Sequence, residues 1–282
     1  MEICRSIEQC RAAIAALRGE GKRIGFVPTM GALHDGHMSL IALARDNAEA
    51  TVVSIFVNPT QFGDATDLEQ YPRDEDRDLA LLEQAGVEVV FLPDVDTMYP
   101  PGDETIVETT RLANMLHGKV RPGHFRGVTS VVNRLFNIVQ PDVAVFGEKD
   151  YQQFLIIKKM VRDLHMPIRI IGGPTMRESD GLAMSSRNRR LTPADRVAAV
   201  VLSRALDAAE EQAKQPNVTV DDIRDVISDT IAAEPRATLR GLDTVAADTL
   251  DYLHGPLNEP MAIMISVQFS DILLIDQRVI QP

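Results

Sequence analysis

His34 and His37 are separated by three positions, where a predicted buried strand at residues 24–27 gives way to a predicted helix. Side chains at i and i+3 share one face of a helix, and imidazole nitrogens can hydrogen-bond a phosphate. A helix N-terminus also presents unpaired backbone N–H groups and the positive end of the helix dipole. The segment is therefore a candidate phosphate site. A helix cap is an alternative, whereas two histidines alone make an incomplete set of metal ligands.

A second polar segment, residues 58–63, follows a β-branched run at 51–57 that predicts a strand. Its sequence, Asn-Pro-Thr-Gln-Phe-Gly, is typical of a turn. Gln61 nevertheless carries donors and acceptors at the carboxyl end of a strand, where its amide could bind a hydroxyl or a carboxylate of a substrate. Both interpretations stay open at this point.

A third segment, residues 147–153, also follows a short predicted strand and opens a predicted helix. Asp150 could cap that helix while Lys149 extends into solvent. Alternatively, the Lys149 ammonium balances phosphate charge, and Gln153, one turn into the helix, faces the same crevice as Gln61.

A fourth segment, residues 183–190, combines Ser185 and Ser186 with three arginines, among them Arg187. Guanidinium groups bind phosphate oxygens in a bidentate manner, and serine hydroxyls add short hydrogen bonds. A basic linker before a helix has the same composition. Because the whole chain carries a net charge of −12, a local basic cluster favours an anionic ligand. With Lys149 and the two histidines, Arg187 would form a pocket for a polyphosphate and its Mg²⁺.

Predicted strands and helices alternate over residues 1–175. Ser6 and Gln9 predict a capping box for a first helix that ends near Gly19. The predicted strands lie at 24–27, 51–57, 87–91, 143–146 and 168–171. This alternation predicts an α/β fold with a mostly parallel sheet and helices on both faces. Ligands of such sheets bind beyond the carboxyl ends of the strands, which is where the first three polar segments lie.

The pattern changes near residue 175, after the Gly-Gly-Pro sequence at 172–174. Further predicted elements are helices capped by Thr192 and Thr219 and short apolar strands at 261–269 and 272–275. We therefore expect two domains, residues 1–175 and a smaller α+β domain of residues 176–282.

Composition and charge disfavour several classes of protein. A net charge of −12 argues against a nucleic-acid partner, which needs a basic surface. No stretch approaches the roughly 20 apolar residues of a membrane span. Cys4 and Cys10 are predicted to share one helix, lack the spacing of a metal site, and are interpreted as reduced thiols of a cytoplasmic protein.

The chain resembles the pantothenate synthetases, or pantoate–β-alanine ligases, a family of the nucleotidylyltransferase superfamily. Six motifs stand in family order, at residues 27–34, 58–62, 71–73, 123–128, 146–153 and 184–188. The superfamily is similar to the class I aminoacyl-tRNA synthetases in its His-x-Gly-His motif and its mobile serine-containing loop. The resemblance implies a Rossmann-like N-terminal domain, a smaller C-terminal domain that covers the active site, and a homodimer.

The reaction that the resemblance implies has two steps. The carboxylate of pantoate attacks the α-phosphorus of ATP, which gives pantoyl adenylate and pyrophosphate in the presence of Mg²⁺. The amine of β-alanine then displaces AMP to form pantothenate. The Mg²⁺ would be held mainly by the ATP phosphates, with no protein ligand assigned.

The resemblance also implies a set of catalytic residues. His37 is the proton donor assigned in the family. We expect His37 and His34 to stabilise developing phosphate charge, because an in-line transfer requires no covalent nucleophile. Lys149 and Arg187 complete the expected catalytic set and, with the two serines of the 183–190 segment, would hold the departing pyrophosphate.

Substrate and nucleotide sites are implied in the same way. Gln61 would contact both pantoate and β-alanine, Gln153 would hold pantoate, and Asn58 would also bind substrate. The implied ATP-binding residues are Met30, Gly31, Ala32, Leu33, His34, Asp35, Gly36, His37, Gly147, Glu148, Lys149, Asp150, Met176, Met184, Ser185, Ser186 and Arg187.

Residues 266–277 depart from the family pattern, which commonly has alanine, glycine and arginine before Leu-Ile-Asp-Asn. This leaves the packing of the C-terminal domain open. Two other functions also stay open, namely a nucleotidyltransferase with a stable adenylylated product and a non-catalytic nucleotide-binding module. The pair of Gln61 and Gln153 favours the ligase, and the acidic charge disfavours a transfer-RNA synthetase.

Overall fold

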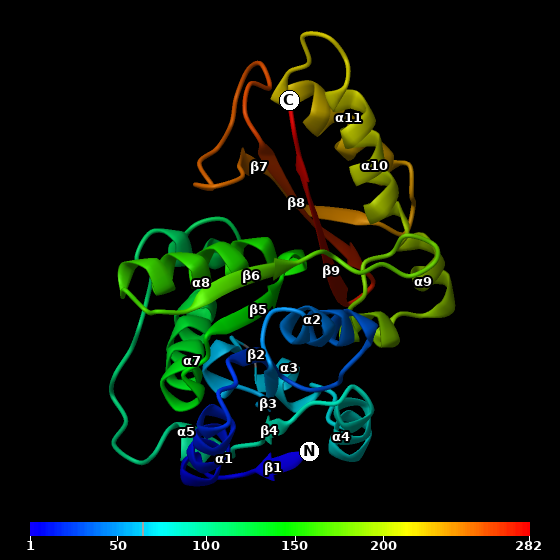
Figure 1. Cartoon of the computed structure of the whole chain (residues 1–282). Coiled ribbons are helices and arrows are strands. Elements are labelled where there is room, and N and C mark those ends of the chain that lie inside the picture. Colours follow the sequence, from blue (N-terminus) through cyan, green and yellow to red (C-terminus); the bar gives the residue numbers. More distant parts are fainter. Residues whose placement is uncertain (64) are drawn as a thin grey trace. The chain divides into compact units, whose positions relative to one another are not determined.

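The chain is organised in two units, which Figure 1 colours along the sequence. The structure, a computed structural model, describes residues 1–63 and 65–282. The first unit comprises Met1–Glu148 and Gln152–Pro174, and the second comprises Lys149–Tyr151 and Thr175–Pro282.

Strands and helices alternate along the first unit. Its strands are β1 (Glu2–Cys4), β2 (Ile24–Thr29), β3 (Ala50–Ile55), β4 (Val89–Phe91), β5 (Val143–Gly147) and β6 (Arg169–Gly173). Its α-helices are α1 (Ile7–Gly19), α2 (Asp35–Arg45), α3 (Ala65–Glu69), α4 (Glu75–Gln84), α5 (Val95–Met98), α6 (His117–Val120) and α7 (His124–Val139). Short 3-10 turns are η1 (Pro59–Gln61), η2 (Leu112–Asn114) and η3 (Glu148–Asp150), and η3 leads into α8 (Tyr151–Asp163).

The strands of the first unit form a six-stranded sheet in the order β1-β4-β3-β2-β5-β6, with neighbouring strands parallel. In the central strand β2, Phe26 pairs with Val52 of β3 on one side and Ala144 of β5 on the other. The chain adds β3 and β4 on one side of β2 and later adds β5 and β6 on the other. Open α/β sheets bind ligands at such a reversal of strand order. The predicted α/β fold with a parallel sheet is confirmed.

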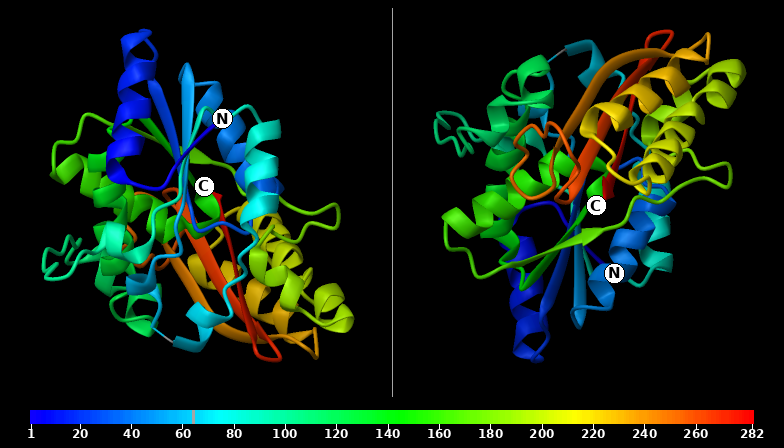
Figure 2. Two further views of the ribbon diagram at one scale, coloured as in Figure 1. Left: turned by 90° about the horizontal axis from the view of Figure 1, so that it is seen from below. Right: turned by 90° about the horizontal axis from the view of Figure 1, so that it is seen from above.

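Helices cover both faces of this sheet. Successive side chains of a strand point to opposite faces, so neighbouring residues of one strand pack against different helices. Val27 packs in one core with Ile41 of α2 and Leu82 of α4. Its neighbour Phe26 meets Phe136 of α7 edge to face, with ring centroids 6.3 Å apart. The left view of Figure 2 shows α1 and α4 on opposite sides of the strands.

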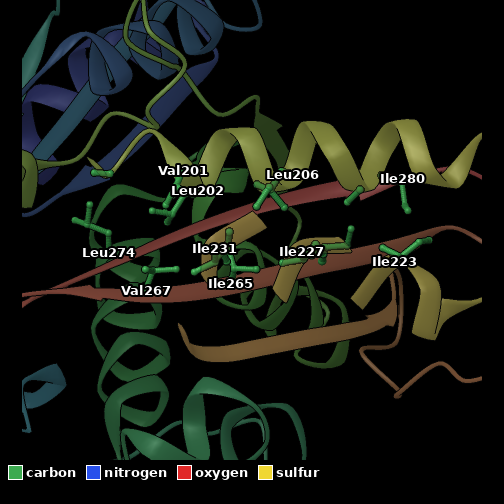
Figure 3. Packing of buried hydrophobic residues seen from close by; sticks show 14 of the residues in the cluster. Val201, Leu202, Leu206, Ile223, Ile227, Ile231, Ile265, Val267, Leu274 and Ile280 are labelled. Carbon is green, nitrogen blue, oxygen red and sulfur yellow. The ribbon is translucent and has the colours of Figure 1, made fainter. Parts of the chain in front are cut away.

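The second unit packs helices against a three-stranded antiparallel sheet. Its strands, in the order β7-β8-β9, are β7 (Thr238–Ala246), β8 (Met261–Phe269) and β9 (Ile272–Ile280). Its helices are α9 (Pro193–Ala198), α10 (Val201–Ala213) and α11 (Val220–Ala232), preceded by the 3-10 turn η4 (Ser186–Arg190). The residues of one buried cluster recur every three or four positions in α10 and α11 and at every second position in β8, so these elements enclose one core (Figure 3).

The divergent segment 266–277 forms the β8–β9 hairpin of the second unit. Its side chains Val267 and Leu274 are buried in the core. Asp276 is 2% exposed and accepts hydrogen bonds from both terminal nitrogens of Arg177, at 2.7 and 3.0 Å. The segment therefore packs as a regular hairpin in spite of its departure from the family pattern.

The first helix begins as predicted, with Ser6 and Gln9 forming a capping box. The prediction that Cys4 and Cys10 share this helix is wrong, because Cys4 ends β1, before the Ser6 cap, and pairs with Phe91 of β4. The three-residue β1 and the polar β7 were not predicted, since neither shows a clear alternation of apolar residues. Over the described residues, no helix has the length and apolar character needed to cross a bilayer.

Cys4 and Cys10 are both free thiols and fully buried. Burial raises the pKa of Cys4 to about 11 and that of Cys10 to about 12. Because the reactive species is the thiolate, we expect neither thiol to react with iodoacetamide at pH 8 in the folded protein. Both should be labelled once the protein is unfolded in urea, as mass spectrometry would show. Rapid labelling of the folded protein would contradict the burial.

The same shifts give a pH dependence with a defined sign. At pH values below the ordinary thiol pKa of 9.0, both thiols are protonated in the folded and in the unfolded state. Their titration therefore does not change the free energy of unfolding in this range. Between there and the folded pKa values the unfolded state ionises first, and the free energy of unfolding falls. A C4A/C10A double variant should therefore lose less stability between pH 8.5 and pH 10.5 than the wild type, each measured by urea unfolding.

Candidate active site

Polar side chains gather beyond the carboxyl ends of β2 and β3, two neighbouring strands of the first unit. Thr29 and Ile55, the last residues of these strands, are partners in the sheet register. The loop after β2 leads to His34, and the turn after β3 contains Gln61. The Gln61 Nε2 lies 3.1 Å from the Met30 Sδ, so the structure brings the two predicted segments together.

The rings of the two histidines lie against each other at the start of α2, with centroids 4.1 Å apart and planes inclined by 47°. His34 is the N-cap, and its Nδ1 accepts a hydrogen bond of 3.2 Å from the Gly36 N–H. The Nδ1 of His37 accepts a bond of 3.4 Å from the His34 N–H. In a neutral imidazole that accepts at Nδ1, the proton is on Nε2. Each ring therefore caps the helix with one nitrogen and carries a donor on the other.

This geometry changes the expectation about the helix N-terminus. The backbone N–H groups of His34 and Gly36 bond the histidine rings, and the His37 N–H bonds the His34 carbonyl oxygen at 2.7 Å. The expectation that these N–H groups are unpaired is wrong, because the side chains placed to bind a ligand also cap the helix. The Nε2 atoms of the two rings are donors that this helix start can offer to a phosphate.

The loop before His34 is held by a residue that the sequence interpretation missed. Ala32 and Leu33 donate their backbone N–H groups to the carboxylate of Asp78 in α4. Asp78 is 1% exposed and lies one helical turn before the buried Leu82. A carboxylate on the apolar face of a helix is the signal that could have identified Asp78 from the sequence.

Asn58 organises the turn that carries Gln61. Its side chain is completely buried, and its Nδ2 donates to the Gly127 carbonyl oxygen at 3.2 Å and to the Gln61 Oε1 at 3.0 Å. Its Oδ1 accepts from the hydroxyls of Tyr99 at 2.8 Å and Thr60 at 2.9 Å. These bonds engage both polar atoms of Asn58 with protein groups. Asn58 thus positions Gln61, whereas the sequence interpretation made Asn58 a substrate ligand.

Further contacts fix the backbone of the same turn. The ring Nδ1 of His124 lies 2.8 Å from the Gln61 carbonyl oxygen. In the tautomer with the proton on Nδ1, this nitrogen donates a hydrogen bond to that oxygen. A Cβ added to Gly127 would lie 2.5 Å from the Thr60 carbonyl oxygen and 2.7 Å from the Gln61 nitrogen. Only glycine allows α7 to approach the turn this closely.

The two glutamines at the start of α8 have different environments. Gln152 is 2% exposed, and its side chain bonds the carbonyl oxygens of Leu112 and Met115, each at 2.8 Å, and the His117 N–H at 3.1 Å. Gln153, the residue expected to hold pantoate, is half-buried in the first turn of the helix. Gln152 is therefore a structural residue, whereas the side chain of Gln153 remains partly exposed.

The remaining candidates belong to the second unit or to the turn before α8. Lys149 is half-buried in η3, whereas Asp150 is exposed. The Ser185 Oγ caps η4 by accepting from the Arg187 N–H at 3.3 Å. Met184 and Met176 are joined by a backbone hydrogen bond of 2.9 Å. The expected ATP-binding residues 176 and 184–187 are thus brought together within this unit.

The side chains beyond β2 and β3 suit an anion better than a cation. In the described part of the chain, no group of three or more His, Cys, Asp or Glu residues could hold a metal ion. The nearby carboxylate of Asp78 is already engaged by two backbone N–H groups. Among the described residues, those beyond β2 and β3 thus supply hydrogen-bond donors for an anion and no cage of carboxylates for a cation.

A parallel sheet with polar groups beyond the carboxyl ends of its strands, next to a switch in strand order, is typical of α/β proteins that bind a nucleotide. The family model for pantoate–β-alanine ligase matches residues 2–279, and the chain belongs to this family. The chain is 49% identical to the pantothenate synthetase of Bartonella quintana, over all of this chain and 98% of that protein. Its identity to the pantothenate synthetase of Agrobacterium fabrum is 50%, over 99% of this chain and 96% of the relative.

Solved structures of the same family resemble this chain over its whole length. The pantothenate synthetase of Thermus thermophilus superposes with a TM-score of 0.94 at 43% identity, over the whole of both chains. The pantoate–β-alanine ligase of Francisella tularensis, solved with a β-γ ATP compound and β-alanine, has a TM-score of 0.80 at 35% identity, over 99% of this chain and 97% of the other. The predicted family, fold class and ligase activity are confirmed.

Proposed function

We propose that this chain condenses pantoate with β-alanine to pantothenate through pantoyl adenylate, with ATP converted to AMP and pyrophosphate. The observation that carries the proposal is the contact between Gln61 and Met30, which joins the amide turn after β3 to the histidine segment after β2. One edge of the sheet thereby offers donors for a phosphate and an amide for a hydroxyl or carboxylate. The Francisella relative, solved with an ATP compound and β-alanine, supports the same pair of ligands.

In the first step, a carboxylate oxygen of pantoate forms a bond to the α-phosphorus, and the bond from that phosphorus to the bridging oxygen breaks. Negative charge grows on the phosphate oxygens during this transfer. The Nε2 donors of His34 and His37 stabilise that charge, and their Nδ1 bonds hold the two rings in place. Lys149, Ser185, Ser186 and Arg187 hold the departing pyrophosphate. A Mg²⁺ carried by the phosphates would supply additional positive charge.

In the second step, the β-alanine amine attacks the carbonyl carbon of the mixed anhydride, and AMP leaves with the electron pair of the broken C–O bond. Gln61 orients pantoate and β-alanine, and Gln153 holds pantoate through its first-turn position in α8. The bonds from Asn58 fix the Gln61 amide, so less freedom is lost when the substrate binds. A homodimer and a cytoplasmic location are proposed on the resemblance alone.

Omission of each substrate in turn tests this proposal. We expect AMP release only when ATP, pantoate and β-alanine are all present, because β-alanine is needed to displace AMP from the adenylate. Without β-alanine, pyrophosphate should appear in an amount close to that of the enzyme. Continuous pyrophosphate release without an amine would indicate a nucleotidyltransferase, and binding of ATP without any turnover would indicate a non-catalytic module. Either result would contradict the ligase.

A further inference from the structure

Asp78 joins α4 to the loop that precedes the two histidines. The Asp78 Oδ2 accepts a hydrogen bond of 2.7 Å from the Ala32 N–H, and its Oδ1 accepts one of 2.8 Å from the Leu33 N–H. Its neighbour Arg77 donates from Nη1 to the Leu33 carbonyl oxygen at 3.3 Å. The first turns of α4 therefore hold the backbone of Leu33 at its N–H and at its carbonyl group.

The loop has a backbone conformation that needs such support. Gly31 and Ala32 have φ values of 77° and 51°, in the left-handed region that alanine seldom adopts. A Cβ on Gly31 would lie 3.0 Å from the Asp78 Oδ2, so the carboxylate packs directly against the turn. Hydrogen bonds to an ionised acceptor are stronger than those between neutral groups. The Asp78 carboxylate thus stabilises the left-handed turn from which the chain enters α2.

His34 directly follows this turn, so the position of its imidazole ring depends on the backbone conformation of residues 31–33. The Leu33 peptide that α4 holds leads into the His34 N–H, which bonds the His37 ring at 3.4 Å. A change in the loop would therefore move both imidazoles relative to the end of β2. Displacements of about 1 Å at reacting groups can lower rates on the order of 10²-fold.

We propose that Asp78 is a positioning residue for adenylate formation, holding the 31–33 loop so that both imidazoles meet the phosphate. This inference rests on the proposed function. It predicts a selective defect, since the second half-reaction needs the Gln61 turn and no transfer at phosphorus. A residue that only stabilised the fold would affect both half-reactions equally.

Replacement of Asp78 by asparagine tests this role with little change in volume. The asparagine Nδ2 must face one of the two backbone N–H groups, so one hydrogen bond becomes a repulsive contact between donors. We expect D78N to slow single-turnover formation of pantoyl adenylate by on the order of 10². Pantothenate formation from preformed pantoyl adenylate and β-alanine should stay within about threefold of the wild-type rate. The matched control is D76N, since Asp76 is exposed on the same helix.

Amide hydrogen exchange of residues 30–37 provides a readout independent of activity. Exchange in this segment should be faster in D78N than in D76N and the wild type, because two bonds to the carboxylate protect it. If D78N does not fold, D78E gives the same test with both acceptor oxygens kept and is expected to show a smaller but equally selective defect.

The possible outcomes separate this inference from the proposed function. A wild-type enzyme that forms no adenylate from ATP and pantoate would overturn the proposed function and this role with it. If the wild type forms adenylate, equal slowing of both half-reactions, or unchanged adenylate formation in the variant, would overturn the positioning role alone. Unchanged exchange at 30–37 would also overturn it.

Discussion

Replacement of His37 by alanine is expected to lower the single-turnover rate of adenylate formation by on the order of 10² or more. The variant loses the Nε2 donor that would meet the phosphate. It also loses the Nδ1 acceptor of the His34 N–H, which is one of the bonds that cap α2. Loss of this capping bond should lower the free energy of unfolding by about 1 kcal/mol. Rapid-quench measurement of pyrophosphate with saturating ATP and pantoate would give the rate.

Two variants separate the two roles of His37. The Oδ1 of an asparagine can occupy the place of the His37 Nδ1 and accept from the His34 N–H, but asparagine has no group at the Nε2 position. We therefore expect H37N to keep the thermal stability of the wild type and to be as slow as H37A. An unchanged single-turnover rate in both variants would mean that His37 only caps the helix.

Replacement of Gly127 by alanine is expected to displace the turn after β3 that carries Gln61. The added Cβ would lie 2.5 Å and 2.6 Å from the Thr60 carbonyl oxygen and carbon, and 2.7 Å from the Gln61 nitrogen. All of these are backbone atoms, so no side-chain rotation can relieve the contact. The Asn58 bond to the Gly127 carbonyl oxygen would be strained as well. Overpacking of this kind costs about 1–3 kcal/mol of stability.

G127A should lower activity as well as stability. A displaced Gln61 would bind pantoate and β-alanine poorly, so we expect kcat/KM for both substrates to fall on the order of 10²-fold. Steady-state kinetics below the melting temperature of the variant would measure this. The control is G19A at the end of α1, where an added Cβ meets no atom within 4 Å. Full activity in G127A would show that α7 and the turn can separate without consequence.

The sequence predicted local features of the fold well. The Ser6 and Gln9 capping box and the central strands follow from residues close together in the chain, and the structure has both. Apolar residues of the correct period suffice to specify such elements, because burial of one face stabilises them. Strand β7 was missed because residues such as Arg240 and Asp243 hide the alternation. Its pairing with β8 depends on residues 15 to 30 positions further along the chain, from Met261 opposite Ala246 to Gln268 opposite Thr238.

The residues expected to face a ligand could be named from the sequence, whereas most of the residues that support them could not. His34, His37 and Gln61 belong to short motifs with evident chemistry. For Asn58, the sequence could not distinguish a ligand from a positioning residue, because its hydrogen-bond partners Tyr99 and Gly127 lie 41 and 69 residues away. An amide has the same chemistry in both roles, and only its neighbours decide which role it has.

The family, the order of the central strands of the parallel sheet along the chain, and the places where polar segments follow them could be read from the sequence. These depend on local composition and spacing, which are readable without a fold. The tertiary structure decided that Asp78 supports the loop before the histidines and that each imidazole uses one nitrogen to cap α2. Asp78 lies 46 positions from Ala32, and a bond over that separation exists only because parallel strands bring α2 and α4 to the same face of the sheet.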